Sequence, residues 1–543
     1  MRLRKRILAV TLASVMAFAF AGCGNDAAET TAPTEKETEA EETKDAEGTE
    51  AEETDADAET KDPVTLVWWY RGNGEQKDTK MVQDALNEKL KTYPGLEHVT
   101  IELKCYTSSE YKQAVTLAQS SKEQIDILNT VNLDFAEEVE KGSLIPMDDL
   151  IDSVDGLKET LPDWLWELGS VDGQIYMVPN YQRAASMNYV ITPTEWLEKY
   201  GDAEKIEETL KKDDASLAEK AAVLEEYTRN VQAGEGATHY MPPLGSMVYN
   251  GYAITDFTDT VYGDYLKVYG EDTVQNKYMT DVMKETFEIS AREYEEGLVH
   301  PDILTINATD FSGANMLNEV SYVFCINNQF GDSERVSKIY SDMYGFDVTA
   351  IPVKDNYYIT NTWAAGGNGI SSSCEHPEEA MAFINAMTQE EGKELYNLVV
   401  YGIEGVHYNK IDDTHIETLE YSGTQGGVDT SYAGIKWILG NTFNAYLNQA
   451  CTDDEMEESL KLNESTDNIR SDLIGCTFKT DAVQTEIEQT TAVATEYSKP
   501  LMYGVMGSGG WEATYNDFID KLKNVGVEAV TAELQSQVDA FLQ

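Results

Sequence analysis

The sequence contains few of the residues that build metal centres and disulfide frameworks. Six cysteines and six histidines are spread over 543 residues, and no CxxC or HExxH spacing occurs. When Cys23 is set aside, an odd number of cysteines remains, and they lie far apart. This usage argues against a zinc site or a disulfide framework. One disulfide bridge could form, but unpaired buried cysteines fit the spacing better. We expect the protein to bind no cofactor.

Positive charge is also scarce. Lysine and arginine number 40 against 98 aspartates and glutamates, which gives a net charge of −58. Residues 64–543 keep about −49 of this, once a basic leader (+4) and an acidic tract (−13) are removed. A body of this charge will not bind nucleic acid or an anionic membrane surface electrostatically. A neutral or cationic ligand is favoured over an anionic one, although a local basic pocket could override the net charge.

The common catalytic and nucleotide-binding motifs are missing. The chain has no nucleophile elbow, phosphate loop or dinucleotide fingerprint. The Gly366–Gly369 stretch, GGNG, is too short for a phosphate loop and has no lysine. We therefore expect a protein that is not an enzyme. Neighbouring carboxylates are abundant in so acidic a chain, however, so a glycoside hydrolase stays open as an alternative.

Only one long apolar run is present, and it lies at the N-terminus. Ile7–Ala21 follows four basic residues and is too short to span a bilayer, which is typical of a signal peptide. The following "AGCGN" resembles a bacterial lipobox, in which the cysteine is lipidated. We expect a signal peptide over 1–22 and a lipid anchor at Cys23 on the extracellular face of a bacterial membrane. A plain signal peptide cut before an incidental cysteine is the alternative.

A long acidic tract separates this leader from the rest of the chain. Residues 24–63 hold sixteen acids, three lysines and no aromatic residue. Such a segment buries too little apolar surface to offset its conformational entropy, which predicts a disordered linker.

From Val64 onward, strand-like and helical patterns alternate. Val64–Tyr70, His98–Tyr106 and Gln124–Val131 read as strands, with helices predicted between them over 77–91 and 109–120. This βαβ order predicts a parallel sheet in an α/β fold. Ligands bind beyond the carboxyl ends of such strands, where the first strand ends in "WWYRGN".

Several motifs in a fixed order resemble one family. The stretches "DILNTVNLDFAEEVEKGSLIPMDDLI", "GQIYMVPN" (Gly173–Asn180) and "HPEEAMAFINAMTQEEGKELYNLVVYGIEGVHY" (His376–Tyr408) are similar to extracellular solute-binding lipoproteins of carbohydrate-type ABC transporters. The resemblance covers nearly all of 64–543. A charged helical passage over 198–228 departs from it and reads as a solvated insertion.

The resemblance implies two α/β lobes joined by a hinge, with a ligand cleft between them. It places lobe 1 at about 64–178 and 309–363, and lobe 2 at about 179–308 and 364–543. It implies a monomer that binds a neutral sugar or oligosaccharide and docks on a membrane permease, with no catalysis. A peptide or another small solute is the alternative ligand.

Candidate ligand-binding residues are aromatic and amide side chains in glycine-containing loops. Aromatic faces cover the C–H patches of a sugar, while amides bond its hydroxyls. The candidates are Trp68, Trp69, Tyr70, Arg71, Asn129, Tyr249, Asn250, Asn328, Gln329, Trp363 and Trp511. Trp68 and Trp69 have opposite strand parity, so either could belong to the core. Arg71 has an alternative role, in which it holds a carboxylate within the site.

Overall fold

The computed structural model describes most of the chain after the acidic tract. The described residues are 61–248, 254–306, 320–327, 333–361, 366–419, 431–449, 451–506 and 510–543. The predicted signal peptide, the lipidation site Cys23 and the acidic linker to residue 60 lie outside them, as do the candidates Tyr249, Asn250, Asn328, Gln329 and Trp363.

The first lobe is built on a five-stranded sheet in the order β2-β1-β3-β14-β6. Its strands are β1 (Val64–Arg71), β2 (Val99–Tyr106), β3 (Ile127–Asn129), β6 (Val178–Pro179) and β14 (Gly367–Ile370). β1 pairs with β2 and β3 in parallel, while β14 runs antiparallel to β3 and β6. The predicted βαβ order is confirmed, because α1 (Thr79–Leu90) and α2 (Tyr111–Ser121) connect the parallel strands. Further helices of this lobe are α3 (Phe135–Glu140), α4 (Asp148–Asp152), α6 (Asp163–Leu168), α14 (Pro377–Thr388), α15 (Lys393–Tyr401) and α16 (Glu455–Glu464).

The alternation of side chains along β1 divides the first lobe into two packed layers. Leu66, Trp68 and Tyr70 enter the larger cluster, together with residues of α1, α14 and α15. Val67 and Trp69 enter a smaller cluster with Tyr111 and other residues of α2. Helices therefore cover both faces of the sheet, as a parallel sheet requires.

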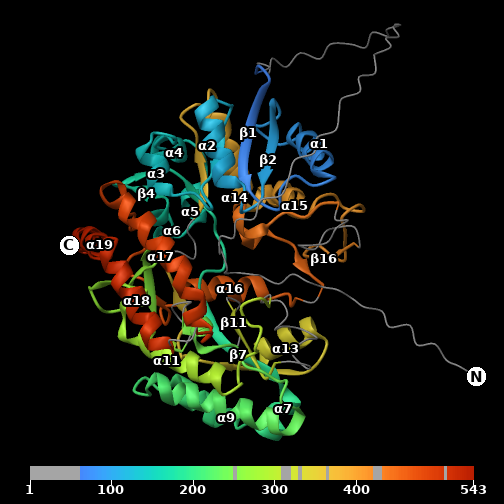
Figure 1. The fold of residues 1–543 in the computed structure, drawn as a ribbon. Coiled ribbons are helices and arrows are strands. Elements are labelled where there is room, and N and C mark those ends of the chain that lie inside the picture. Colours follow the sequence, from blue (N-terminus) through green and yellow to red (C-terminus); the bar gives the residue numbers. More distant parts are fainter. Residues whose placement is uncertain are drawn as a thin grey trace, which may run out of the picture.

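The second lobe is built on an antiparallel sheet in the order β11-β7-β12. Its strands are β7 (Met187–Pro193), β11 (Val323–Asn327) and β12 (Val348–Pro352), and a hairpin sheet adds β8 (Thr258–Tyr262), β9 (Tyr265–Val268) and β10 (Val274–Asn276). Its main helices are α7 (Thr194–Tyr200), α8 (Ala203–Lys211), α9 (Leu217–Glu235), α10 (Leu244–Val248), α11 (Asp281–Glu295), α13 (Ser333–Tyr344), α17 (Gln484–Met502), α18 (Gly510–Asn524) and α19 (Val527–Phe541). Figure 1 shows the two lobes one above the other, with α17–α19 along one side.

Within the described residues, three segments connect the lobes, and they lie side by side. The first follows β6, the second contains β13 (Tyr358–Ile359), and the third contains β18 (Ile469–Arg470). β13 pairs in parallel with β18, and Ser186 of the first segment bridges to Tyr358. We call these three adjacent segments the hinge.

The expected division into lobes is wrong in two places. Residues 309–363 were assigned to the first lobe, but β11 and β12 both pair with β7 of the second. Residues 364–543 were assigned to the second lobe, but β14, α14 and α15 belong to the first sheet and its core. The return to the second lobe follows β18, because Leu473 packs in the second-lobe core. Local sequence pattern predicts a strand but does not say which sheet it joins.

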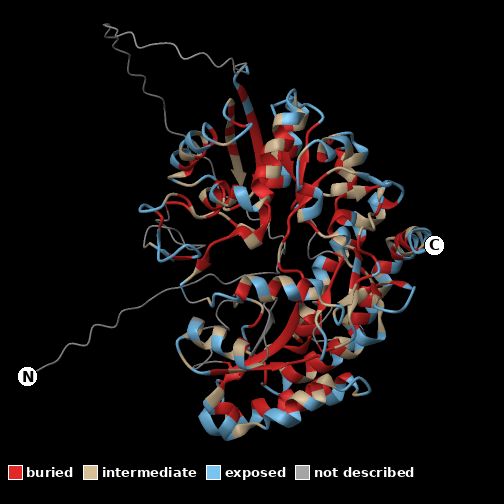
Figure 2. Cartoon of the chain, turned by 180° about the vertical axis from the view of Figure 1, so that it is seen from behind, coloured by how far each residue is buried: buried red, intermediate tan, exposed pale blue. Residues whose placement is uncertain are grey.

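The charged passage over 198–228 is amphipathic rather than solvated throughout. Ser216 starts α9 with a capping box to Glu219, which satisfies free backbone N–H groups. Ile206, Leu210 and Leu224 are buried in the second-lobe core. Figure 2 shows the general pattern, with buried strands inside and exposed outer faces on the helices. None of the helices in the described ranges combines the length and apolar composition that crossing a bilayer requires.

One buried carboxyl makes stability depend on pH. Glu293 of α11 is fully buried and accepts a hydrogen bond of 2.9 Å from the backbone N–H of Leu244. Burial raises its pKa from 4.5 to about 8. The folded state then holds a proton that the unfolded state releases above about pH 4.5. The free energy of unfolding should therefore fall as pH rises from about 4.5 to 8.

Glu293→Gln should remove this dependence, because glutamine cannot ionise. We expect the variant to gain on the order of 1–3 kcal/mol over the wild type at pH 8, with the gain shrinking toward pH 5. Urea unfolding at pH 8 and pH 5 measures this gain in the free energy of unfolding. Glu288→Gln, on the exposed face of the same helix, is the control. Equal pH slopes in wild type and Glu293→Gln would contradict the assignment.

A buried ion pair fixes the third connecting segment to the second lobe. The ammonium of Lys267 on β9 is fully buried, and its Nζ lies 2.9 Å from Oδ1 of Asp472. The Asp472 side chain keeps 40% of its surface exposed. If the pair is broken, water can therefore solvate the Asp472 carboxylate but cannot reach the Lys267 ammonium.

Asp472→Asn should destabilise the protein more than Lys267→Met does. The first change leaves a buried ammonium without a carboxylate in ion-pair distance among the described residues, at a cost of about 3 kcal/mol. The second leaves a carboxylate that water can solvate. Urea unfolding of both variants measures the loss in the free energy of unfolding. A larger loss in Lys267→Met than in Asp472→Asn would refute the prediction.

Candidate functional site

The carboxyl edge of the first sheet faces the hinge. β1 ends at Arg71, β3 ends at Asn129, and β6 ends at Pro179, directly before the first connecting segment. β14 runs in the opposite direction, so its first residue, Gly367, lies at the same edge. This edge is where a parallel sheet offers a ligand site.

A layer of buried amides lies beneath the edge. Asn368 Oδ1 accepts hydrogen bonds from Trp68 Nε1 at 3.0 Å and from Asn129 Nδ2 at 3.2 Å. The carbonyl oxygen of Ile438 accepts from Asn129 Nδ2 at 3.0 Å and from Asn180 Nδ2 at 2.6 Å. The layer joins five segments that are distant in sequence, and it gives the edge a fixed floor.

Three of the candidate aromatics lie behind the edge rather than at its surface. Trp68, Trp69 and Tyr70 are each exposed by 3% or less. Trp69 stacks on Tyr106 with ring centroids 5.1 Å apart, and its Nε1 donates to Gln124 O. Trp68 lies 5.6 Å from the ring of Phe383 on the opposite face of the sheet. β1 pairs with β2 along its whole length and with β3 at Trp68 and Trp69. Helices cover both faces of this sheet, so these side chains are buried.

Arg71 is the first side chain of this stretch that is only half-buried. Its Cζ lies 5.1 Å from the centroid of the Trp437 ring. Its Nε and Nη1 are shielded from solvent and have no hydrogen-bond partner among the described residues. Burial lowers the pKa of the guanidinium. An arginine stacked on an aromatic ring at this edge is suited to binding a ligand.

Trp437 was missed by the sequence reading. It lies in a short 3₁₀ turn over Lys436–Ile438, just before the amide-containing loop "GNTFNAYL". Its sequence signal is weak, because isoleucines flank it and suggest core packing. Only the tertiary structure brings it to Arg71.

The loop after β1 holds the Trp437 segment in place. Gln76 donates from Nε2 to Ala433 O at 2.8 Å, and its Oε1 accepts from Ala433 N at 2.8 Å. Asn73 Nδ2 also donates to Ala433 O, at 2.9 Å. Gly72 permits this close packing, since a Cβ there would lie 2.4 Å from Cys105 Sγ. A cavity of about 10 Å³ between these residues and Tyr432 has room for about one water.

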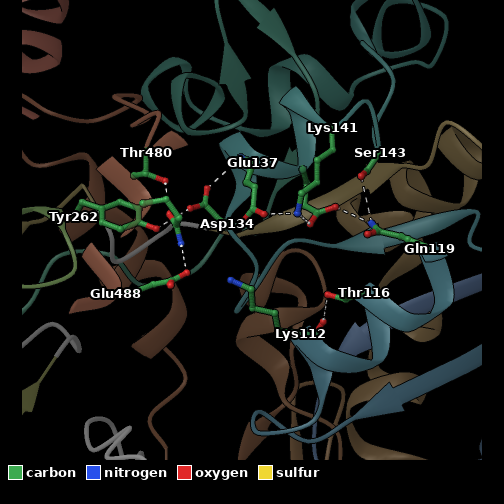
Figure 3. Close-up of polar contacts among 12 residues, drawn as sticks. Lys112, Thr116, Gln119, Asp134, Glu137, Lys141, Ser143, Tyr262, Thr480 and Glu488 are labelled. Carbon is green, nitrogen blue, oxygen red and sulfur yellow. Dashed lines mark hydrogen bonds and ion pairs between the residues drawn. The ribbon is translucent and has the colours of Figure 1, made fainter. Parts of the chain in front are cut away.

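The second lobe contacts this side of the first lobe through polar groups. Tyr262 at the end of β8 donates to Asp134 Oδ2 at 3.2 Å, and Asp134 also caps α3 by accepting from Glu137 N (Figure 3). Burial, and then the charge of Asp134, raise the pKa of Tyr262. Lys479 lies 3.3 Å from Glu140, so the segment that begins the C-terminal helices also contacts α3. These contacts span the two lobes.

Trp511 and a second hollow lie away from the Arg71–Trp437 pair. Trp511 is half-buried on α18 and packs against the second-lobe core, 6.5 Å from the ring of Tyr515. A larger hollow of about 610 Å³ lies at the opposite, amino end of the sheet, beside Thr65, Gln124 and Ser372. It is lined by both acids and bases, and no part of the Arg71–Trp437 pair enters it. Cys105, Cys374, Cys451 and Cys476 are free thiols.

Known proteins resemble the chain over most of its length. The family model for bacterial extracellular solute-binding proteins matches residues 84–402, more than half of the chain, and a model for a domain of unknown function matches residues 472–543. A carbohydrate ABC transporter substrate-binding protein of Streptococcus pneumoniae is 25% identical over 446 residues, which are 80% of this chain and 83% of the relative.

Solved structures show the same two-lobe fold. The N-glycan transport solute binding protein NgtS from Streptococcus pneumoniae superposes with a TM-score of 0.69 at 20% identity, over 88% of this chain and 99% of that one. FusA, a substrate-binding protein of Streptococcus pneumoniae, superposes with a TM-score of 0.54 at 14% identity, over 88% and 99%. The two-lobe α/β fold expected from the sequence is thereby confirmed. The chain belongs to the family of bacterial extracellular solute-binding proteins, which bind solutes and are not enzymes.

Proposed function

We propose that this chain is the substrate-binding subunit of a carbohydrate ABC importer. It captures an oligosaccharide between its two lobes and delivers it to a membrane permease. The observation that carries the proposal is the Arg71–Trp437 stack at the carboxyl edge of the first sheet. Trp437 offers a ring face for the C–H patch of a sugar, and Arg71 offers unused N–H donors.

The relatives support a sugar ligand. NgtS has been crystallised with Man1GlcNAc and with Man5GlcNAc, and FusA with kestose. The streptococcal sequence relative is a carbohydrate transporter subunit. Trp437 supplies the apolar wall that such ligands need, and Arg71 supplies polar N–H donors beside it.

The predicted site residues take two different roles in this proposal. Arg71 and Trp437 contact the ligand, while Trp68 and Asn129 hold the floor through Asn368. Trp69 and Tyr70 support β1 from within the core. The candidates that we propose as further contacts are Tyr249, Asn250, Asn328, Gln329 and Trp363. Trp511 instead packs against the second-lobe core.

Ligand capture also requires movement and attachment. The hinge lets the lobes close, and the ligand stabilises the closed form by its higher affinity for it. The protein acts as a monomer that is anchored through lipidated Cys23, with residues 24–63 as a tether. Its contacts are then the sugar, the permease and the membrane through the lipid alone.

Calorimetric titration of the chain without its leader against a panel of oligosaccharides tests the proposal. We expect saturable binding, with the sugars recovered intact by product analysis. Shortened sugars would instead identify a hydrolase, and binding of peptides but no sugar would move the function to another solute.

Trp437→Ala should weaken the binding of any sugar that the panel identifies. Loss of a stacked aromatic wall costs about 1–3 kcal/mol, or roughly five- to 150-fold in Kd. Trp437→Phe keeps a ring face and should retain most of the affinity. Unchanged affinity in Trp437→Ala, in a protein with a normal unfolding midpoint, would remove Trp437 from the site.

A further inference from the structure

Arg71 has no anionic partner among the residues that the structure describes, although the chain is rich in carboxylates. The sequence holds 98 acids against 40 lysines and arginines. Arg183, Arg229, Arg292 and Arg335 each lie within 4.0 Å of a carboxylate oxygen. The Arg71 side chain forms no ion pair with any of the described residues, and its buried Nε and Nη1 form no hydrogen bond with them. The alternative in which Arg71 holds a protein carboxylate therefore finds no support in the part of the chain that the structure describes.

The surroundings of Arg71 favour an incoming anion. Its Nε and Nη1 are shielded from water and unbonded, and donors in this state cost free energy until an acceptor arrives. Trp437 covers one face of the guanidinium, and the thiol of Cys105 is the nearby titratable group that affects it. Burial raises the pKa of that thiol to about 11, so it is neutral at physiological pH. The side chain as a whole is only half-buried, so part of it is open to a ligand.

The second stacked arginine shows what a structural role looks like. Arg470 lies over the Trp164 ring at 5.6 Å, and its Nη2 also donates to Asn463 O at 2.8 Å. That guanidinium is tied into the hinge by a backbone acceptor. Arg71 has the stacking ring but lacks such an acceptor among the described residues.

We infer that the ligand of this site carries a carboxylate, as a uronic or sialic acid residue does, and that Arg71 binds that carboxylate while Trp437 covers the adjacent sugar ring. The inference rests on the proposed function and narrows its substrate class. A planar guanidinium matches a carboxylate in a two-bond geometry that a hydroxyl does not reproduce. The acidic body does not prevent this, because physiological salt screens charges beyond about 8 Å.

The test compares acidic sugars with their own methyl esters, in which the carboxylate is replaced by an uncharged ester group. Full-length protein is titrated calorimetrically with sialyllactose, digalacturonate, the methyl ester of each, and lactose. We expect at least one acid to bind about tenfold more tightly than its ester, and the acid that does so separates the sialic from the uronic source. In Arg71→Gln the ratio of ester Kd to acid Kd should fall toward one, and Arg71→Lys should retain part of it.

Arg470→Gln is the matched control, since it removes a second arginine that stacks on tryptophan and should leave the ratio of ester Kd to acid Kd unchanged. Equal affinity for acid and ester in the wild type would overturn the inference, as would a ratio that survives in Arg71→Gln. Binding of neutral oligosaccharides but of neither acid would overturn it and leave the proposed function intact. Failure of every neutral and acidic sugar would instead refute the proposed function.

Discussion

The carboxamide of Asn368 is the contact on which the candidate site depends. Its oxygen accepts from the indole of Trp68 and from Asn129, so it joins β14 to β1 and β3 at the carboxyl edge. All three side chains are buried, exposed by 4% or less. Hydrogen bonds in such surroundings are costly to leave unmade. The same Asn129 amide reaches Ile438 O, so the floor also positions the turn that carries Trp437.

The aromatic residues at the end of β1 support the candidate site from within the core and do not lie on its surface. Trp68, Trp69 and Tyr70 fill the layers on both sides of the sheet and keep β1 rigid up to Arg71. The loop that follows is then clamped to Ala433 by Gln76 and Asn73. Sites held by such a fixed shell bind with less loss of conformational entropy. At this edge of the described structure, Arg71 and Trp437 are half-buried, and buried neighbours support both of them.

The connecting segments give the lobes a shared boundary with distinct polar contacts. Tyr358 of the second segment donates to Asp259 on β8 at 2.6 Å, while Asp472 of the third meets buried Lys267 on β9. The region from residue 472, which matches a domain of unknown function, then packs its helices into the second lobe and reaches α3 of the first through Lys479. Its residues therefore belong to the boundary between the lobes as well as to the second core.

The sequence by itself determined the α/β class, the strand–helix–strand order after Val64, and the carboxyl edge of β1 as the place to look for a site. These follow from hydrophobic periodicity and from the right-handed βαβ connection, which act over short stretches of chain. It did not determine which lobe β11, β12 and β14 join, because strand pairing is a contact between residues that are distant in sequence. It also left undecided whether Trp68 or Trp69 faces a ligand, and both proved to be buried once helices covered the two faces of the sheet. Only the tertiary structure set Trp437 against Arg71, because their meeting depends on hydrogen bonds between the loop at residues 72–76 and a segment more than 350 residues further along the chain.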